Sequence, residues 1–488
     1  MGHMDTGNPT TPLLTWRGIL IALGLSIVLC WPMWVFSGYF VFADTASYFR
    51  GGGAIWRTLF DLIPSTGTQV AADPAGTAPN SASGGLKVDA GGQSTVGRSF
   101  TYSALAYSAY SVLGFWFLPI LQAFTALIFV FALIDATILA RPAVLLIGIA
   151  MVAAVSTLPW YSVYLMPDIF AALVILYAAL LLGRYDDLTR RQKVFFTLLA
   201  ALCVTFHYGY PPLMGGLVAF VLLWRLVERR LSAGFIAAAL VPLLFAPLLN
   251  ITASSAVLGN ASAAPQRLPI LLARSLEDGP AYWYLKQSCP DAGFALCEIF
   301  GDELPSNVGA FLWTDDGIAA LTADQMDQIR AEEFKVLISA FRAYPIAQTQ
   351  SLLGNAAKQA VMIGTGNISA ATDFGQRFRP QLQERGERAR EALRIFDPIV
   401  VWGTWLLSAP LLLLAGAGQL SRQHMKVLAV VIVGLLLNAG IFGGLSAPVE
   451  RYQSRVIWLL PLLSALFVSA WSAKLQLGRR SNKGATRA

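Results

Sequence analysis

The sequence predicts an all-α integral membrane protein with about ten transmembrane helices, a large first outer loop and a small, mainly helical extracytoplasmic domain. Only 13% of the 488 residues are charged, well below the roughly 25% of a soluble domain, and 56% are hydrophobic. Many apolar residues fall in runs of roughly 20, the length of a bilayer-spanning helix. Residues 251–397 are too polar to span and too long for a linker, so they predict the separate domain.

Ten apolar segments are expected to cross the bilayer as helices, because a helix satisfies its backbone polar groups without water. Pro159 and Pro167 separate the third segment from the fourth, since proline interrupts a helix. The ten segments lie near residues 17–39, 112–139, 143–163, 168–184, 194–209, 212–227, 233–250, 398–418, 424–444 and 454–473.

Basic residues indicate the orientation of these spans. They gather in three short connections and in the C-terminal tail, all on one side of a ten-span chain, and this side is expected to be cytoplasmic. Both termini are then cytoplasmic, in a multi-pass protein of a bacterial inner (cytoplasmic) membrane. The formal net charge of +7 is explained without a nucleic acid partner. The basic residues are Arg184, Arg190, Arg191 and Lys193; Arg225, Arg229 and Arg230; Arg422 and Lys426; and Lys474, Arg479, Arg480, Lys483 and Arg487.

The chain start gives two further expectations. Gly2-His3-Met4 resembles a cloning remnant with Met4 as the natural start. No cleavable signal peptide is expected, because the first apolar segment lacks a small-residue cleavage site and leads directly into the outer loop.

The predicted organisation has three parts. Residues 1–250 form a transmembrane core that includes the outer loop 40–111, residues 251–397 form the extracytoplasmic helical domain, and residues 398–488 contain the last helices and a basic cytoplasmic tail. Residues 65–97 within the outer loop are rich in Gly, Ser, Thr, Ala and Pro without an apolar period. We expect them to form a flexible loop that orders when a substrate binds.

Two features predict the structure of the extracytoplasmic domain. Cys289 and Cys297 lie close together in an oxidising compartment, so we expect a disulfide. Thr322 and Gln325 have the spacing of a capping box, which marks a helix start. The expected apolar stripe of this helix, which ends before Pro345, is Met326, Ile329, Leu337 and Phe341, and a second helix is expected from Ile346 to about Met362.

An arginine-rich stretch at residues 377–394 has two interpretations. Six Arg residues alternate there with Glu384, Glu387 and Glu391, which is typical of a solvated, salt-bridged helix. The same residues are also suited to a basic surface for phosphate headgroups or an anionic acceptor.

Asp44 lies where the first span leaves the bilayer, and it too has two interpretations. It is suited to capping a helix that begins at Thr45. A carboxylate at the boundary of lipid and water is also well placed for chemistry on a lipid-linked substrate. The sequence contains no Walker motif, Gly-rich phosphate loop or Cys/His metal spacing, which argues against a nucleotide-driven pump.

Four short motifs occur in order on the predicted outer face. They are Phe42-Ala43-Asp44-Thr45 after the first span; Gly97-Arg98-Ser99-Phe100-Thr101-Tyr102-Ser103-Ala104-Leu105 with residues 118–124 before and within the second; Met166-Pro167-Asp168 at the fourth; and Glu450-Arg451-Tyr452 before the last. This order resembles the polytopic glycosyltransferases of the GT-C class, which use lipid-phosphate sugar donors. The resemblance covers the membrane core and not residues 251–397.

The resemblance implies a polyprenyl-phosphate sugar as donor and a glycan, lipid or protein as acceptor, in a membrane of lipids. Asp44 would act as general base, with inversion at the anomeric carbon. Arg451 or Arg98 would stabilise the departing phosphate, with Tyr452 and His207 also near the donor. Asp168 and Tyr102 would orient the acceptor, or Asp168 would be a second acidic residue that holds a divalent cation with Asp44. From the residues alone, Asp168 is equally suited to capping the helix after Pro167.

The sequence departs from the GT-C pattern at three places, and metal use therefore stays open. Thr45 stands where many members have a second acidic residue, no proline separates Arg98 from Tyr102, and His207 replaces a basic residue after the fifth span. Two other classes remain as alternatives. An O-antigen ligase or polymerase acting on lipid-diphosphate glycans agrees with the arginine-rich stretch, and a lipid or sugar transporter requires internal repeats or broken helices.

Overall fold

The computed structural model describes residues 13–36, 40–42, 44–61, 98–258, 261–265, 267–289, 291–368 and 380–485, and these ranges contain helices and no β-strand. Six helices are long and apolar enough to cross a membrane, or seven if the bent pair α4–α5 counts as one span. The predicted all-helical class is therefore confirmed for the described part of the chain. The expected flexible loop 65–97 lies outside the described residues.

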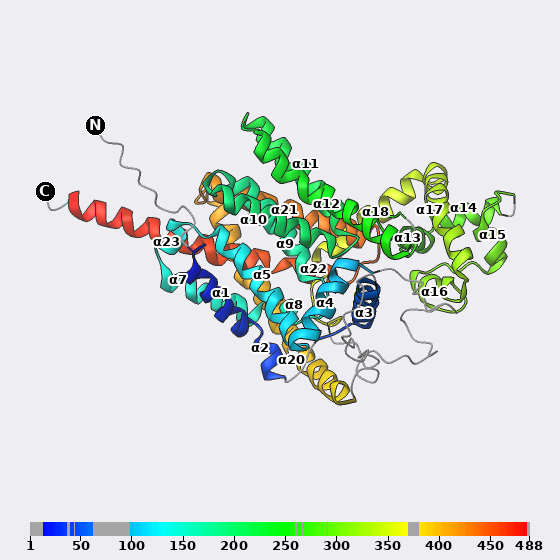
Figure 1. The fold of residues 1–488 in the computed structure, drawn as a ribbon. Helices are drawn as coiled ribbons and strands as arrows, with labels where there is room; N and C mark the ends of the chain where they lie inside the picture. Colours follow the sequence, from blue (N-terminus) through cyan, green and yellow to red (C-terminus); the bar gives the residue numbers. More distant parts are fainter. Residues whose placement is uncertain are drawn as a thin grey trace.

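The apolar helices form a bundle from which a group of shorter helices projects at one end (Figure 1). The bundle contains α1 Trp16–Leu29, α2 Trp31–Val35, α3 Thr45–Asp61, α4 Phe100–Leu113, α5 Phe117–Leu133, α6 Ala136–Leu139, α7 Pro142–Val155, α8 Leu158–Ser162, α9 Ile169–Arg184, η1 Tyr185–Asp187, α10 Arg190–Thr205, α11 Tyr210–Val227, α12 Ala233–Leu258, α20 Pro380–Gly416, α21 Arg422–Asn438, the π-helical η4 Ala439–Gly444, α22 Glu450–Ile457 and α23 Leu459–Ala485.

Helix α9 is the centre of the bundle. All of its residues are buried, and it packs against α21, α11, α10 and α5. The apolar run that predicts this span is therefore surrounded by protein. By contrast, α12 and α20 turn apolar side chains such as Leu244, Leu248 and Leu412 outward, as expected of helices that face lipid.

Several predicted spans differ from the helices that form. The segment expected at 143–163 divides into the 14-residue α7 and the short α8, with a break at Ser156 and Thr157. The segment expected at 112–139 starts in the last two residues of α4, continues as α5, which turns by 119° from α4, and ends in α6. Gly114 ends α4 with a φ of 76°, a left-handed conformation that favours glycine, so the apolar run cannot continue as one helix. The first apolar segment forms only the 14-residue α1, followed by α2.

The predicted first outer loop contains two helices, α3 and α4, which pack against each other. Their close approach depends on Gly52, because a Cβ atom there would collide with the carbonyl oxygen of Ser103 and with Tyr107. This pair places the residues before α3 and before α4 side by side, and these residues include Asp44 and Arg98.

The projecting helices have a hydrophobic core of their own, which includes Leu272, Phe311 and Ile329. Cys289 and Cys297 are joined by a disulfide, as predicted. These helices are α13 Ile270–Asp278, α14 Pro280–Ser288, α15 Ala295–Phe300, η2 Gly301–Glu303, α16 Val308–Trp313, η3 Ile318–Ala320, α17 Ala323–Ala343 and α18 Pro345–Val361.

Helix α17 begins with the predicted capping box of Thr322 and Gln325, and α18 follows close to the expected bounds. The expected apolar stripe is correct only at its start. Met326 and Ile329 are buried, but Phe341 is 45% exposed because the buried positions continue through Glu333, Val336 and Ala340.

Helix α18 connects the projecting helices to the bundle. The amide of Gln359 bonds both the N–H and the carbonyl oxygen of Val449, and Gly443 of η4 lies against Gln359. After α18 the chain enters the bundle, where the backbone of Gly364 exchanges hydrogen bonds with the Ser454 hydroxyl. The segment that follows α18 is therefore buried beside α22 at Gly364.

Candidate functional site

Four segments that are distant in sequence meet at the end of the bundle from which the short helices project. The Leu165 N–H donates to the carbonyl oxygen of Phe40, which joins the residues before α3 to the turn before α9. The hydroxyl of Ser99 donates to the carbonyl oxygen of Thr205, and that of Tyr208 to the carbonyl oxygen of Arg98. These backbone contacts gather the sequence-predicted site residues at one end of the molecule.

Asp44 and Arg98 form an ion pair. The guanidinium Nη2 of Arg98 donates to Oδ1 of Asp44 at 2.6 Å, and each side chain is 20% exposed. Helix α3 does begin at Thr45, and the Asp44 carbonyl accepts N–H groups of its first turn, but the carboxylate bonds Arg98. Burial lowers the pKa of Arg98, and the neighbouring Asp44 carboxylate more than offsets this effect, so the pKa lies above its usual value. Arg98 is therefore charged.

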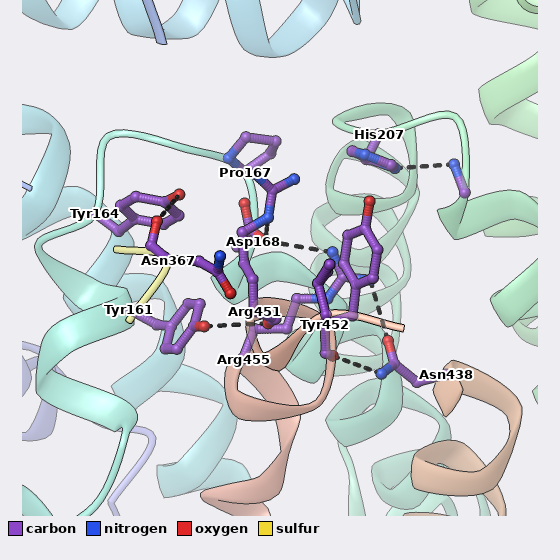
Figure 2. A network of polar contacts seen from close by, with 12 residues as sticks. Tyr161, Tyr164, Pro167, Asp168, His207, Asn367, Asn438, Arg451, Tyr452 and Arg455 are labelled. Atoms are coloured by element: carbon purple, nitrogen blue, oxygen red, sulfur yellow. Dashed lines mark hydrogen bonds and ion pairs between the residues drawn. The ribbon is translucent and has the colours of Figure 1, made fainter. Parts of the chain in front are cut away.

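Asp168 is buried between two arginines (Figure 2). Its Oδ1 lies 3.2 Å from Nε of Arg451 and 3.4 Å from Nη1 of Arg455, and its side chain is only 1% exposed. Of the two interpretations of Asp168, the side-chain helix cap does not form, although the residue stands at the N-cap position of α9. Asp168 precedes α9 in a helical conformation and makes no side-chain cap bond, because its carboxylate points toward the guanidinium groups on α22.

Arg455 is a residue that sequence reasoning missed. It is fully buried, donates to Oδ1 of Asn438 at 3.1 Å, and places its guanidinium carbon 3.9 Å from the ring centroid of Phe442. The sequence analysis did not select Arg455 because it lies inside the span expected at 454–473. Two signals identify it: a charge in an apolar run is rarely structural alone, and a spacing of four residues puts it on the helix face of Arg451.

His207 lies in the turn between α10 and α11 and is neutral. Its Nδ1 accepts the Gly209 N–H at 3.0 Å, so the proton of the neutral ring is on Nε2. Burial holds the pKa of His207 well below its usual value, and the cations Arg455, Arg451 and Arg98 lower it further. His207 therefore offers a neutral hydrogen-bond group rather than a positive charge.

The two predicted tyrosines have different positions. Tyr102 is fully buried and donates to Gln122, whose amide donates to the carbonyl oxygens of Ser162 and Tyr164. Tyr102 is therefore part of a buried hydrogen-bond network beside the site and is not exposed to an opening. Tyr452 is half-buried, and the guanidinium carbons of Arg451 and Arg455 lie 5.3 Å and 5.0 Å from its ring centroid.

The site carries more positive than negative charge. Arg451 lies within electrostatic reach of Asp44 as well as Asp168, which joins the two ion pairs into one group. The group contains the two carboxylates and the three guanidiniums of Arg98, Arg451 and Arg455, an excess of one positive charge. The nearby Glu450 lies instead against Gly364 and Gly366. Nε of Arg98 and Nε of Arg455 are buried without a hydrogen-bond partner.

The described residues contain no cluster of three or more His, Cys, Asp or Glu side chains that would suit a metal ion. Asp44 and Asp168 each contact a guanidinium, so a cation placed at either carboxylate would meet a positive charge at close range. Charge complementarity at this site favours an anion.

No family model matches the chain, and no curated protein or solved structure gives a significant match. The fold and the site together define an all-helical protein of membrane type, with a buried group of three arginines and two aspartates at one end of its bundle.

Proposed function

We propose that the protein is a GT-C-type glycosyltransferase that moves a sugar from a polyprenyl-phosphate donor to an acceptor hydroxyl on the outer, periplasmic face of the membrane, with inversion. The observation that carries this proposal is the excess guanidinium charge beside a solvent-accessible carboxylate. A lipid phosphate supplies the missing negative charge, and its prenyl tail stays in the bilayer beside the bundle.

Asp44 is the carboxylate suited to be the general base. Its side chain is 20% exposed, whereas Asp168 is 1% exposed and held by two arginines. In the reaction the acceptor oxygen attacks the anomeric carbon, the bond from that carbon to the phosphate oxygen breaks, and the acceptor proton passes to Asp44. The phosphate leaves with the electron pair, and its charge is stabilised by the arginines.

Arg98 couples donor binding to the activation of this base. While its Oδ1 accepts the hydrogen bond from Arg98, the Asp44 carboxylate is engaged by the guanidinium rather than by an acceptor hydroxyl. A donor phosphate offers Arg98 a second anionic partner, and Nε of Arg98 is buried without one. When Arg98 turns toward the phosphate, Asp44 becomes available to the acceptor hydroxyl. Arg451, which is bound to Asp168 and lies over the Phe42 ring, adds charge from deeper in the site.

The proposed arrangement in the membrane keeps ten crossings, with both termini in the cytoplasm of a bacterial cell. In this arrangement α1, α5, α7 and α10 complete the crossings, although each is shorter than 18 residues. Asp44, Arg98, Asp168 and Arg451 then face the periplasm together. The acceptor is a glycan, lipid or protein hydroxyl that arrives from the aqueous side.

The test is Asp44→Asn in purified, reconstituted protein supplied with polyprenyl-phosphate sugars. Asparagine keeps the shape and removes the basicity, so transfer is expected to fall by at least about a hundredfold while donor binding persists. Asp186→Asn is the matched control, because Asp186 also pairs with an arginine, Arg225, but lies at the far end of α9. A near wild-type transfer rate in Asp44→Asn would exclude Asp44 as the base.

The donor identity is tested separately by mass spectrometry of envelope lipids from cells that lack the protein. Accumulation of a polyprenyl-phosphate sugar, with loss of one residue from a glycan, is the expected result. Accumulation of lipid-diphosphate glycans would instead indicate a ligase or polymerase, and an unchanged lipid pool would contradict both enzymatic classes.

A further inference from the structure

Helices α17 and α18 expose apolar side chains that no described part of the chain covers. On the second half of α17 these are Phe334, Ile338 and Phe341, which repeat at intervals of four and three residues and share one face. Ile346, Leu353 and Val361 follow on α18, and Ile346 is 72% exposed. We define these six residues as the outer apolar face.

Within the chain segment that carries the outer apolar face, the charged residues are all basic. Between Phe334 and Val361 the chain contains Lys335, Arg342 and Lys358 and no Asp or Glu. The first half of α17 is different, since it exposes Asp324 and Asp327. An apolar face with only cations beside it is complementary to an anionic lipid surface.

Aromatic side chains mark the corner between the two helices. Trp283 of α14 is 43% exposed and meets Tyr344 edge-on, with ring centroids 5.4 Å apart. Tyr344 is the residue at which α17 ends and α18 begins. Trp and Tyr are enriched at the level of lipid headgroups, where their rings are partly buried in lipid.

Helix α18 packs at the end of two helices that are long and apolar enough to span a membrane. Its inner side packs on η4, which continues the apolar helix α21, and on α22 at the start of the last span. The carbonyl oxygen of Leu352 and the side chain of Gln359 contact Gly444 and Val449. In a membrane crossed by these two spans, the other side of α18 would lie near the depth of the headgroups.

We propose that the outer apolar face is a membrane-docking surface, on which the second half of α17 and α18 lie in the lipid interface with Lys335, Arg342 and Lys358 toward anionic phosphates. The occupant is the lipid surface of the same membrane that the bundle crosses. The polar first half of α17 rises from this surface and holds the disulfide-bonded helices in water. The docking does not depend on any chemistry at Asp44.

The test measures depth in full-length protein reconstituted in nanodiscs with one copy each. Single cysteines at Ile338→Cys and Leu353→Cys are labelled with a fluorophore, after the buried Cys30 and Cys203 are replaced by alanine. Gln328→Cys on the polar half of α17 is the aqueous control, and Leu244→Cys on α12 is the lipid control. Labels at 338 and 353 are expected to be quenched by headgroup-proximal spin-labelled lipids and to lose iodide quenching several-fold relative to 328.

The charges are tested in the same discs. Lys335→Gln with Lys358→Gln is expected to weaken lipid quenching at 338 and 353 when anionic lipids are present, and to leave 244 unchanged. Iodide quenching at 338 and 353 equal to that at 328 would overturn the proposal. Protection that appears only in discs with two copies would also overturn it, and would assign the face to a second copy of the chain.

Discussion

Asp168→Asn removes the carboxylate that pairs with two buried guanidiniums, those of Arg451 and Arg455. At distances of 3.2 Å and 3.4 Å, the Coulomb attraction to Arg451 and to Arg455 is about 5 kcal/mol for each pair at an effective dielectric constant of about 20. Desolvation of the three ions offsets much of this attraction in the native protein. The substitution leaves the desolvation of the two guanidiniums in place and removes the attraction, so the free energy of unfolding is expected to fall by about 3–5 kcal/mol.

Arg455→Met is expected to destabilise the protein less than Asp168→Asn, because Asp168 keeps Arg451 and one buried cation is removed. The double variant should then recover part of the loss. We expect a coupling free energy of about 0.5–3 kcal/mol between the two positions, since they are in direct contact. The measurement is equilibrium unfolding in mixed micelles with increasing SDS, for the two single variants, the double variant and wild type.

Asp186→Asn is the control for this cycle. Its carboxylate also pairs with an arginine, at 2.8 Å from Arg225, but it is 64% exposed and is expected to cost about 1 kcal/mol or less. The reasoning is refuted if Asp168→Asn is no more destabilising than Asp186→Asn. It is also refuted if the effects of the Asp168 and Arg455 substitutions add without coupling.

Three further predictions concern other parts of the molecule. The folded-state pKa of His207 is lowered, so below about pH 6.5 only the unfolded chain takes up its proton. The free energy of unfolding should therefore fall on acidification. His207→Gln should flatten this dependence of the free energy of unfolding on pH between about pH 7.5 and 5.5. Gly443→Ala places a Cβ against Gln359 and should cost about 1–3 kcal/mol, seen as weaker hydrogen-exchange protection of α18; unchanged protection would contradict this packing. Replacing both Cys289 and Cys297 by serine removes a disulfide of sequence separation 8 and should lower the free energy of unfolding by about 2.5 kcal/mol in the chain-entropy model. The measurement is proteolysis of α14 and α15, which should be faster in the variant than in wild type.

The sequence predicts which residues share an end of the bundle but not which of them pair. Alternation of spans and loops places Asp44, Arg98, Asp168 and Arg451 on one side, and the structure gathers them there. The pairing depends on tertiary packing: Asp44 contacts Arg98 across 54 residues, and Asp168 contacts Arg455 across 287. Neither separation has a local signal.

Hydropathy also fails to predict what surrounds an apolar helix. Helices α9 and α20 have similar mean hydropathies, 1.7 and 1.9, yet 94% of the α9 window and 28% of the α20 window are buried in protein. An apolar side chain is equally stable against lipid and against another helix, so composition cannot separate the two. Local signals succeed where the cause is local, as at the capping box of Thr322 and Gln325.

The ion pairs near the two ends of α9 contain the same residue types but differ in their balance of positive and negative charge. At the Arg184 end, three separate sets of ion pairs contain four acidic and four basic groups, Asp135, Asp186, Asp187 and Glu228 with Arg184, Arg225, Arg422 and Lys426. Lys193 and the exposed Arg230 also lie within electrostatic reach of Asp186. At the Asp168 end, three guanidiniums share two carboxylates. A buried excess charge is costly without a counterion, so this end gains more from a bound anion than the other. The charge balance of the ion pairs therefore supports the proposal that a lipid phosphate binds at the Asp168 end.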